Sequence, residues 1–266
     1  MLNQFFEPGI ILGIAQAAVA ALFALLLMLL ARQRQVHVER ETIIALLRGF
    51  SQIVLVGSIL LLLLQGPFWV SYFVLAAMIT AAASIAARRA RGIPGAFKVS
   101  LVGIGLGAGI VILAMSLFGV IDTAVTSLIP VGSMVIANAM NTNALALDRY
   151  QAEVKTHRGQ IEAALALGAD PKVTVTPYVQ AAVQASLIPR LDSLSSLGIV
   201  WIPGLMTGMI LAGSDPIYAA IYQFAVLAMI FAGSGLTAVT STQLIRTYTF
   251  SPADQLIIQS QTVKQQ

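Results

Sequence analysis

The sequence contains no cysteine and only two histidines, His37 and His157. Disulfide bonds, thiolate metal sites and a Cys-x-x-Cys redox pair are therefore excluded, and so is a zinc cluster built from Cys and His ligands. Charged residues are also scarce, at 10% of the chain, where soluble domains carry about a quarter. Apolar residues make up 58% of the 266 residues, and the mean hydropathy is +0.88. This composition excludes a soluble globular domain and predicts an all-α, polytopic membrane protein.

The apolar residues are gathered in continuous stretches of about the 20 residues that a helix needs to cross a bilayer. The first stretch is too long for a signal peptide and no basic residue precedes it, so we interpret it as a retained span. We expect the whole chain, 1–266, to form a single transmembrane domain. Its seven predicted spans are 9–31, 42–64, 67–87, 99–121, 125–147, 193–213 and 216–239.

The basic residues predict the orientation of these spans. All 15 Lys and Arg residues lie on one side of the predicted spans, and cytoplasmic loops are the ones that carry such an excess. The opposite side holds only the acids Glu7, Asp122 and Asp215. We therefore expect the N-terminus outside, the C-terminus in the cytosol and a plasma (inner) membrane location. The net charge of +4 then reflects topology, so no nucleic acid partner is expected.

The longest segment between spans is 148–190, which we expect to be a cytosolic coupling region. Its sequence "EAALALG" resembles the EAA-x-x-x-G loop through which ABC-transporter permeases contact their ATPase. Gly168 suits a helix C-cap with a left-handed backbone, and the following proline marks the stop. The alternative is an ordinary amphipathic interfacial helix that ends in glycine. The predicted ATPase-coupling residues are Glu162, Ala163, Ala164, Gly168, Ala169, Asp170 and Pro171.

Three longer blocks carry a wider resemblance: "RGFSQIVLVG", "IPVGSMVIANAM" and the run from "LALGADPKVTVTPYVQ" to "DPIYAAIYQ". With them the chain resembles the Fet-type (UPF0014) ABC transporter permease family, which includes the membrane subunit of the bacterial Fet iron exporter and plant aluminium-tolerance permeases. The "IxLP" that the importer class has about ten residues after the glycine is missing, and "SLIP" comes later. Importer-type contacts are therefore not carried over.

The resemblance implies a permease subunit that exports iron or another metal ion, as a homodimer driven by a cytosolic ABC ATPase. ATP and Mg would bind the ATPase, because this chain has no Gly-Lys pair and hence no phosphate loop. We expect neither an enzyme nor a cofactor in this chain. An ABC permease for a nucleotide sugar or a lipid is one alternative. A motor-free channel or secondary carrier is another, although we expect no acid or base in the central membrane zone to drive it.

Polar and helix-breaking residues inside spans are candidates for the substrate pathway. Each has an alternative role: interhelical hydrogen bonds for the asparagines and packing for the methionines. The predicted pathway residues are Met134, Asn138, Asn141, Pro203, Gly204, Met206, Thr207 and Met209, and the metal ligands are unknown.

Three further polar residues, Arg48, Gln52 and Asp192, form a candidate cytosolic gate. For Arg48 the alternative is snorkelling to the cytosol, and for Asp192 it is a helix N-cap at the start of the sixth span. The Gly103/Gly107 and Gly105/Gly109 pairs predict close helix packing rather than a dinucleotide loop, because they lie inside an apolar span.

Overall fold

A computed structural model describes residues 9–33, 39–63, 67, 69–90 and 93–258, and almost all of its ordered segments are helices. Within this described part there is no β-strand, only two isolated bridges. The chain forms two compact units, Met1–Gly66 and Pro67–Gln266, and each is described by itself. The prediction of an all-α membrane protein is confirmed, since several of these helices are long and apolar enough to cross a bilayer.

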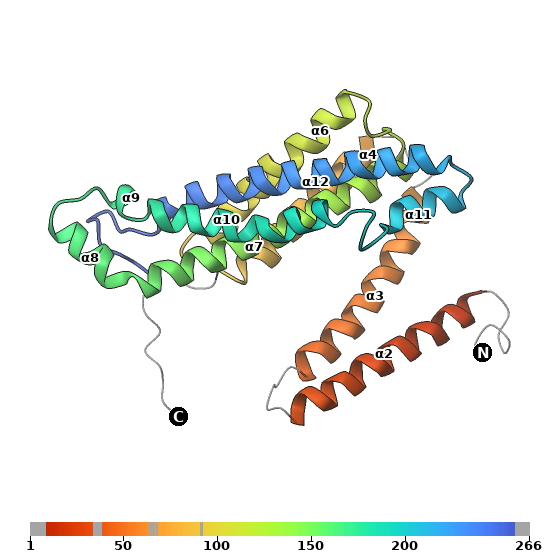
Figure 1. Ribbon diagram of the computed structural model, residues 1–266, viewed down its shortest axis with the longest axis horizontal. Helices are drawn as coiled ribbons and strands as arrows, with labels where there is room; N and C mark the ends of the chain where they lie inside the picture. Colours follow the sequence, from red (N-terminus) through yellow and green to blue (C-terminus); the bar gives the residue numbers. More distant parts are fainter. Residues whose placement is uncertain (1–8, 34–38, 64–66, 68, 91–92, 259–266) are drawn as a thin grey trace. The chain divides into compact units, whose positions relative to one another are not determined.

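The first unit is a pair of helices, α2 (Ile10–Gln33) and α3 (Glu39–Leu63) (Figure 1). Along most of α2 the apolar side chains are exposed on all sides, among them Ile10, Phe23 and Leu27. A helix that is apolar all round is stable in lipid rather than in water. These exposed side chains therefore identify a lipid-facing helix pair.

The second unit is a helical bundle built around α7 (Val125–Thr156) and α12 (Pro216–Ile245), which pack along each other (Figure 1). The helix α10 (Thr176–Ser195) packs against both of them, and α4 (Trp69–Ala87) packs on α7. One further rod runs through α5 (Ala96–Ile104), the π-helical turn η1 (Gly105–Gly109) and α6 (Ile110–Leu117). The short helices are α8 (Arg158–Ala166), α9 (Pro171–Thr174), α11 (Gly204–Leu211) and the 3-10 turn η2 (Arg246–Tyr248).

Five described helices or helical rods meet the length and hydropathy of a membrane span. They correspond to the predicted first, second, third, fourth and seventh spans. The predicted fifth span lies in α7, which continues beyond it to Thr156. By length and hydropathy α7 is not among the five, since asparagine, threonine and serine interrupt its apolar residues.

The predicted sixth span, 193–213, is not one helix, and this prediction is corrected. α10 ends at Ser195, non-helical residues follow from Ser196 to Pro203, and α11 then adds only eight residues. We expected a break at Pro203 and Gly204, but those residues begin a helix rather than interrupt one. Pro203 lacks the N–H that a helix interior requires, and an extended backbone at this residue serves as the N-cap of α11.

Glycines 103 and 107 let the α5–η1 rod approach α12 closely. A Cβ on Gly107 would lie 2.6 Å from the backbone nitrogen of Thr237 and 2.7 Å from the carbonyl oxygen of Gly233, and a Cβ on Gly103 would collide with Ser241. Close packing is thus confirmed for this pair. It is wrong for the other pair, since a Cβ on Gly105 would meet nothing within 4 Å and one on Gly109 only an ordinary contact.

A second hydrophobic cluster joins the expected cytosolic ends of the bundle. It contains Leu147, Tyr150 and Val154 of α7, together with Val175 and Val179 at the start of α10. The chain that follows α12 covers these residues. The Tyr150 hydroxyl forms a hydrogen bond of 2.8 Å with the Thr249 hydroxyl, and both side chains are completely buried. Burial raises the pKa of Tyr150 to about 12, although the Thr249 hydrogen bond and the charge of Arg246 offset part of this effect.

We expect Gly107→Ala to lower the free energy of unfolding by about 1–3 kcal/mol, because backbone atoms that cannot move aside stand where the methyl group would go. The matched control is Gly105→Ala on the same helical turn, which has open space and should be neutral or slightly stabilising. Thermal unfolding of the purified chain in detergent compares the two. Equal midpoints for both variants would contradict close packing at Gly107.

Tyr150 also predicts a pH dependence. An unfolded tyrosine ionises near pH 10, whereas the folded one keeps its proton to about pH 12. Its contribution to stability is therefore complete below pH 10 and is lost as the pH rises to about 12, by at most about 2.5 kcal/mol. Tyr150→Phe should lack this part of the alkaline loss. Unfolding midpoints of the two proteins from pH 8 to pH 11.5 measure it, and parallel curves would contradict the prediction.

Candidate transport pathway

A polar cavity in the second unit lies where α6, α7, α11 and α12 approach one another. It has a volume of about 660 Å³. The polar side chains among its lining residues carry oxygen atoms, one carboxylate and several hydroxyl groups, and none of them is Lys, Arg or His. We call it the outer cavity because its loop, 118–124, lies on the side expected outside. It is lined by Ser116, Gly119, Val120, Ile121, Asp122, Thr123, Thr126, Ser127, Pro130, Val131, Leu205, Met209, Tyr218 and Tyr222.

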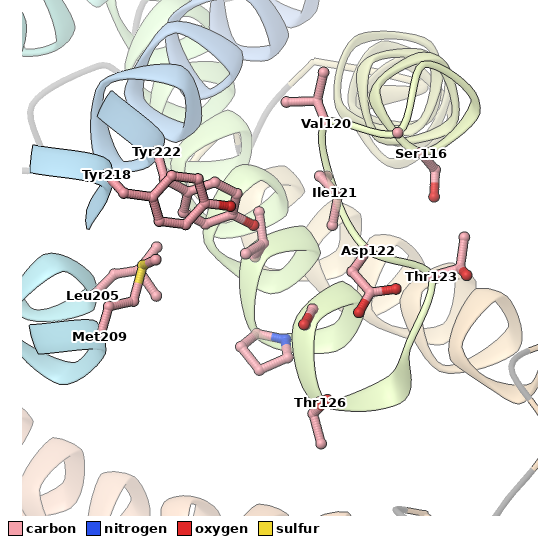
Figure 2. Close-up of a pocket in the computed structure, with 14 residues that line it drawn as sticks. Ser116, Val120, Ile121, Asp122, Thr123, Thr126, Leu205, Met209, Tyr218 and Tyr222 are labelled. Carbon is pink, nitrogen blue, oxygen red and sulfur yellow. The ribbon is translucent and has the colours of Figure 1, made fainter. Parts of the chain in front are cut away.

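The polar groups of the outer cavity come from two sides. Figure 2 shows Asp122 on the loop before α7 and Tyr222 on α12 pointing toward the same space. One oxygen of Asp122 accepts the backbone N–H of Ala124 at 3.1 Å, which fixes the direction of the carboxylate. Tyr218 and Tyr222 stack with their ring centroids 6.4 Å apart. Carboxylate and hydroxyl oxygens arranged in this way suit a hard cation or a hydrated polar solute.

The second cavity, which we call the inner cavity, has a volume of about 130 Å³. Four predicted pathway residues line it. Met134 and Asn138 come from α7, Pro203 is the N-cap of α11, and Gly204 is its first residue. Two residues that sequence reasoning did not select also line it, Arg190 of α10 and Gln223 of α12. The non-helical segment before α11 therefore borders the inner cavity, as do Met134 and Asn138 of α7.

Hydrogen bonds hold the polar side chains of the inner cavity in place. The Asn138 amide donates to the carbonyl oxygen of Met134 at 2.7 Å, and its side-chain oxygen accepts from Arg190. The Gln223 side-chain oxygen accepts the backbone N–H of Met206 at 3.3 Å. Met206 thus takes part through its backbone, since its side chain does not line the cavity.

The other predicted pathway residues are spread over the bundle. Met209 borders the outer cavity, whereas Thr207 is exposed and donates to the carbonyl oxygen of Pro203 at 3.3 Å. Asn141 is exposed and lines neither cavity. The neighbouring Asn143 is buried and donates to the Ser100 hydroxyl at 2.9 Å, which is the interhelical hydrogen bond that was the alternative for these asparagines. The part played by each residue in transport stays a prediction.

Arg190 corrects our expectation that the central membrane zone holds no base. We expected this residue at the end of the cytosolic coupling region, 148–190. The structure continues α10 through Pro189 to Ser195, so Arg190 lies beside Asn138 within the predicted fifth span. A sequence signal existed: Val179, Ala182 and Ser186 form a buried stripe at helical spacing, and the next position of that stripe is 190.

The predicted coupling residues gather on one exposed turn formed by α8 and α9, which we call the platform (residues 158–174). Gly168 has a φ of +83° and allows the chain to reverse after α8, which confirms its expected left-handed conformation. Asp170 caps α9 by accepting the backbone N–H groups of Lys172 and Val173 at 2.7 and 3.3 Å, and Pro171 is the first residue of α9 rather than a simple stop.

The remaining coupling residues lie mostly on the surface of the platform. Glu162 is exposed and pairs at 2.7 Å with Arg158. Ala163 and Ala169 are exposed, and Ala164 is half-buried.

The candidate gate divides between the two units. Arg48 and Gln52 lie exposed on α3 in the first unit, whereas Asp192 belongs to the second. The units are not placed relative to each other, so the gate stays a prediction. The N-cap alternative for Asp192 is wrong, because this residue lies inside α10 near its end. Asp215 does cap a helix, accepting the backbone N–H groups of Ile217 and Tyr218 at 2.9 Å at the start of α12.

Among the described residues, no group of three or more His, Asp or Glu side chains could hold a resident metal ion. The two cavities instead offer single charges, hydroxyls and amides. Polar cavities along helices of a membrane-spanning bundle are the features of a transport protein.

The chain belongs to UPF0014, a family described as an uncharacterised protein family, whose model matches residues 14–250. It is 31% identical over 239 residues to the UPF0014 membrane protein YjkA of Bacillus subtilis (strain 168), covering 88% of this chain and 94% of YjkA. It is 30% identical over 246 residues to Protein ALUMINUM SENSITIVE 3 of Arabidopsis thaliana, covering 92% and 90%.

A third similar protein is the probable iron export permease protein FetB of Escherichia coli (strain K12). The two sequences are 28% identical over 242 residues, which cover 91% of this chain and 93% of FetB. No solved structure matches the chain. Family membership and the apolar helices together make this chain a membrane permease, a transport protein rather than an enzyme, integral to the inner membrane.

Proposed function

We propose that the chain is the permease subunit of an ABC transporter, driven by a separate ATPase that binds the platform and carries the ATP and Mg. The supporting observation is the platform itself. It exposes apolar side chains, with Leu167 90% and Val173 66% exposed, in the same segment as the exposed, charged Glu162. Exposed apolar residues next to a charge are typical of a protein interface.

The base of the platform is rigid, as a coupling element requires. Ile161 of α8 and Val175 before α10 are completely or almost completely buried in the same cluster as Tyr150 and Val154 of α7. A displacement of the platform is therefore transmitted to α7 and α10. These two helices carry Asn138 and Arg190, so movement would reach the inner cavity directly.

The proposed cargo is a metal ion, with iron as the first candidate, moved outward. The outer cavity supports this proposal because the polar side chains that line it carry oxygen atoms, the donors that hard cations prefer. The printed name of the Escherichia coli relative points the same way. A nucleotide sugar or a lipid is the second candidate cargo, and the positive charge of Arg190 at the inner cavity favours it. We further propose that two copies of the chain assemble with two ATPase subunits.

Glu162→Arg should abolish ATPase binding and ATP-dependent transport while the protein stays folded and inserted. The change reverses the charge of the platform, whereas the ion pair lost with Arg158 is exposed and worth about 0.5 kcal/mol or less. Co-purification of the ATPase with the tagged chain from native membranes measures binding. Asp148→Arg, an equal charge reversal at an exposed site on α7, is the matched control. Unchanged assembly and transport in Glu162→Arg would refute the coupling role.

Asp122→Asn should weaken the response to metal by about tenfold at low salt, because it removes the carboxylate charge of the outer cavity. The asparagine oxygen can still accept from Ala124, so the loop should keep its shape. The measurement is the Fe²⁺ concentration that half-maximally stimulates ATP hydrolysis by the reconstituted complex. Asp215→Asn is the control, since Asp215 caps α12 and lies outside the cavity lining. An identical response in wild type and Asp122→Asn would reject a cation site here.

A further inference from the structure

The inner cavity contains a positive charge that the rest of the described chain leaves uncompensated. Arg190 donates from Nη1 to the side-chain oxygen of Asn138, a neutral acceptor. Its Nε is buried and has no hydrogen-bond partner in the part of the chain that the structure describes. Among the same residues no carboxylate lies within 4 Å of its guanidinium. A charge inside a membrane bundle is costly unless it is paired, so an unpaired one indicates a function.

Gln223 provides a second, independent indication. Its side chain is 1% exposed, and its oxygen accepts the backbone N–H of Met206. Since a backbone N–H can only donate, this contact fixes the orientation of the amide and leaves its NH₂ group as the free end. That nitrogen is buried and finds no partner among the described residues. Two residues that line the cavity, Arg190 and Gln223, therefore each have one buried polar atom without a partner among the described residues, and both atoms are N–H donors.

The surroundings of these donors add to their preference for negative charge. Asn138 cannot compensate the guanidinium further, because its oxygen is already shared with Arg190 and its amide donates to Met134. Gly204, the first residue of α11, also lines the cavity, and the N-terminal end of a helix carries a partial positive charge. A guanidinium presents its N–H groups in a planar fork that matches carboxylate and phosphate oxygens.

We propose that the inner cavity is an oxyanion site, in which Arg190 and Gln223 bind a carboxylate or phosphate group of the cargo. A volume of about 130 Å³ corresponds to about four water molecules and admits one such group rather than a whole nucleotide. A bare metal cation would be repelled by Arg190. The cargo therefore passes this point either as a metal ion held by an oxyanionic ligand or as a metal-free oxyanion. The identification of the bound group as cargo depends on the proposed transport function. The binding of an oxyanion in this cavity does not depend on it.

Trp201 gives a direct readout because it also lines the inner cavity and the chain has only two tryptophans. In a Trp69→Phe background, the full chain in detergent is titrated with inorganic phosphate, with citrate and with gallium citrate, a redox-silent substitute for ferric citrate. We expect a saturable change of the Trp201 emission. Tighter binding of gallium citrate than of citrate would identify a metal complex as the source of the oxyanion. Equal binding of all three probes would identify a metal-free oxyanion.

Arg190→Gln should weaken binding of the oxyanion probes at least tenfold. Arg190→Lys keeps the positive charge but lacks the planar pair of N–H donors, and it should weaken binding less. Arg149→Gln is the matched control: it removes one positive charge from an exposed site paired with Glu153 and should bind as wild type does. No saturable emission change with any probe, or equal affinity in wild type and Arg190→Gln, would overturn the proposal.

Thermal unfolding distinguishes loss of the binding site from poor folding of the Arg190→Gln variant. Without anion, Arg190→Gln should be at least as stable as wild type, because it removes an uncompensated charge, and 20 mM phosphate should raise the wild-type midpoint only. A purely structural arginine would give the opposite result, a less stable variant and a wild type indifferent to phosphate. Neither measurement involves the ATPase. The oxyanion site is therefore tested independently of ATPase binding to the platform.

Discussion

The central constraint in this structure is one half-buried guanidinium, that of Arg190, whose Nε is buried without a partner among the described residues. Asn138 accepts one of its N–H groups, and Asn138 itself donates to the carbonyl oxygen of Met134. These hydrogen bonds link α10 to α7 beside the inner cavity. The cavity also explains why the helix break follows directly after α10. An irregular backbone at membrane depth is stable where it borders a polar cavity rather than lipid.

α7 connects the parts of the second unit that the proposed function requires. One continuous helix extends from Thr126 and Pro130 at the outer cavity, past Asn138 at the inner cavity, to Val154 under the platform. A rigid helix of this length moves as a unit, so a force on its polar end shifts both cavities together. The π-helical turn η1 is the part of the rod that packs most closely on α12, because Gly107 leaves no room for a side chain there. The rod, α12 and α7 therefore pack closely together, since Gly233 of α12 also approaches Val135 of α7.

Much of the fold could be predicted from local patterns. Long apolar runs gave the spanning helices, and Gly168 gave the reversal after α8, because only its own backbone conformation was needed. The errors arose where tertiary contacts override a local signal. Pro189 reads as a helix boundary, yet α10 continues through it because its buried stripe packs on α7 and α12. Arg190 was expected at the end of the cytosolic coupling region instead. Gly105 was expected to pack closely because the spacing alone does not tell which side of a helix meets a neighbour.

The two cavities differ in the sign of the groups that they offer, and this difference restricts the cargo. The inner cavity offers N–H donors and a positive charge, whereas the outer cavity offers hydroxyl oxygens and the carboxylate of Asp122. A simple cation would meet repulsion at the first and attraction at the second, and a simple anion the reverse. A metal ion held by an oxyanionic ligand would be recognised at both, through the ligand at Arg190 and through the metal at Asp122. Such a cargo would change partners as it crosses, and neither cavity would hold it tightly enough to stop its release.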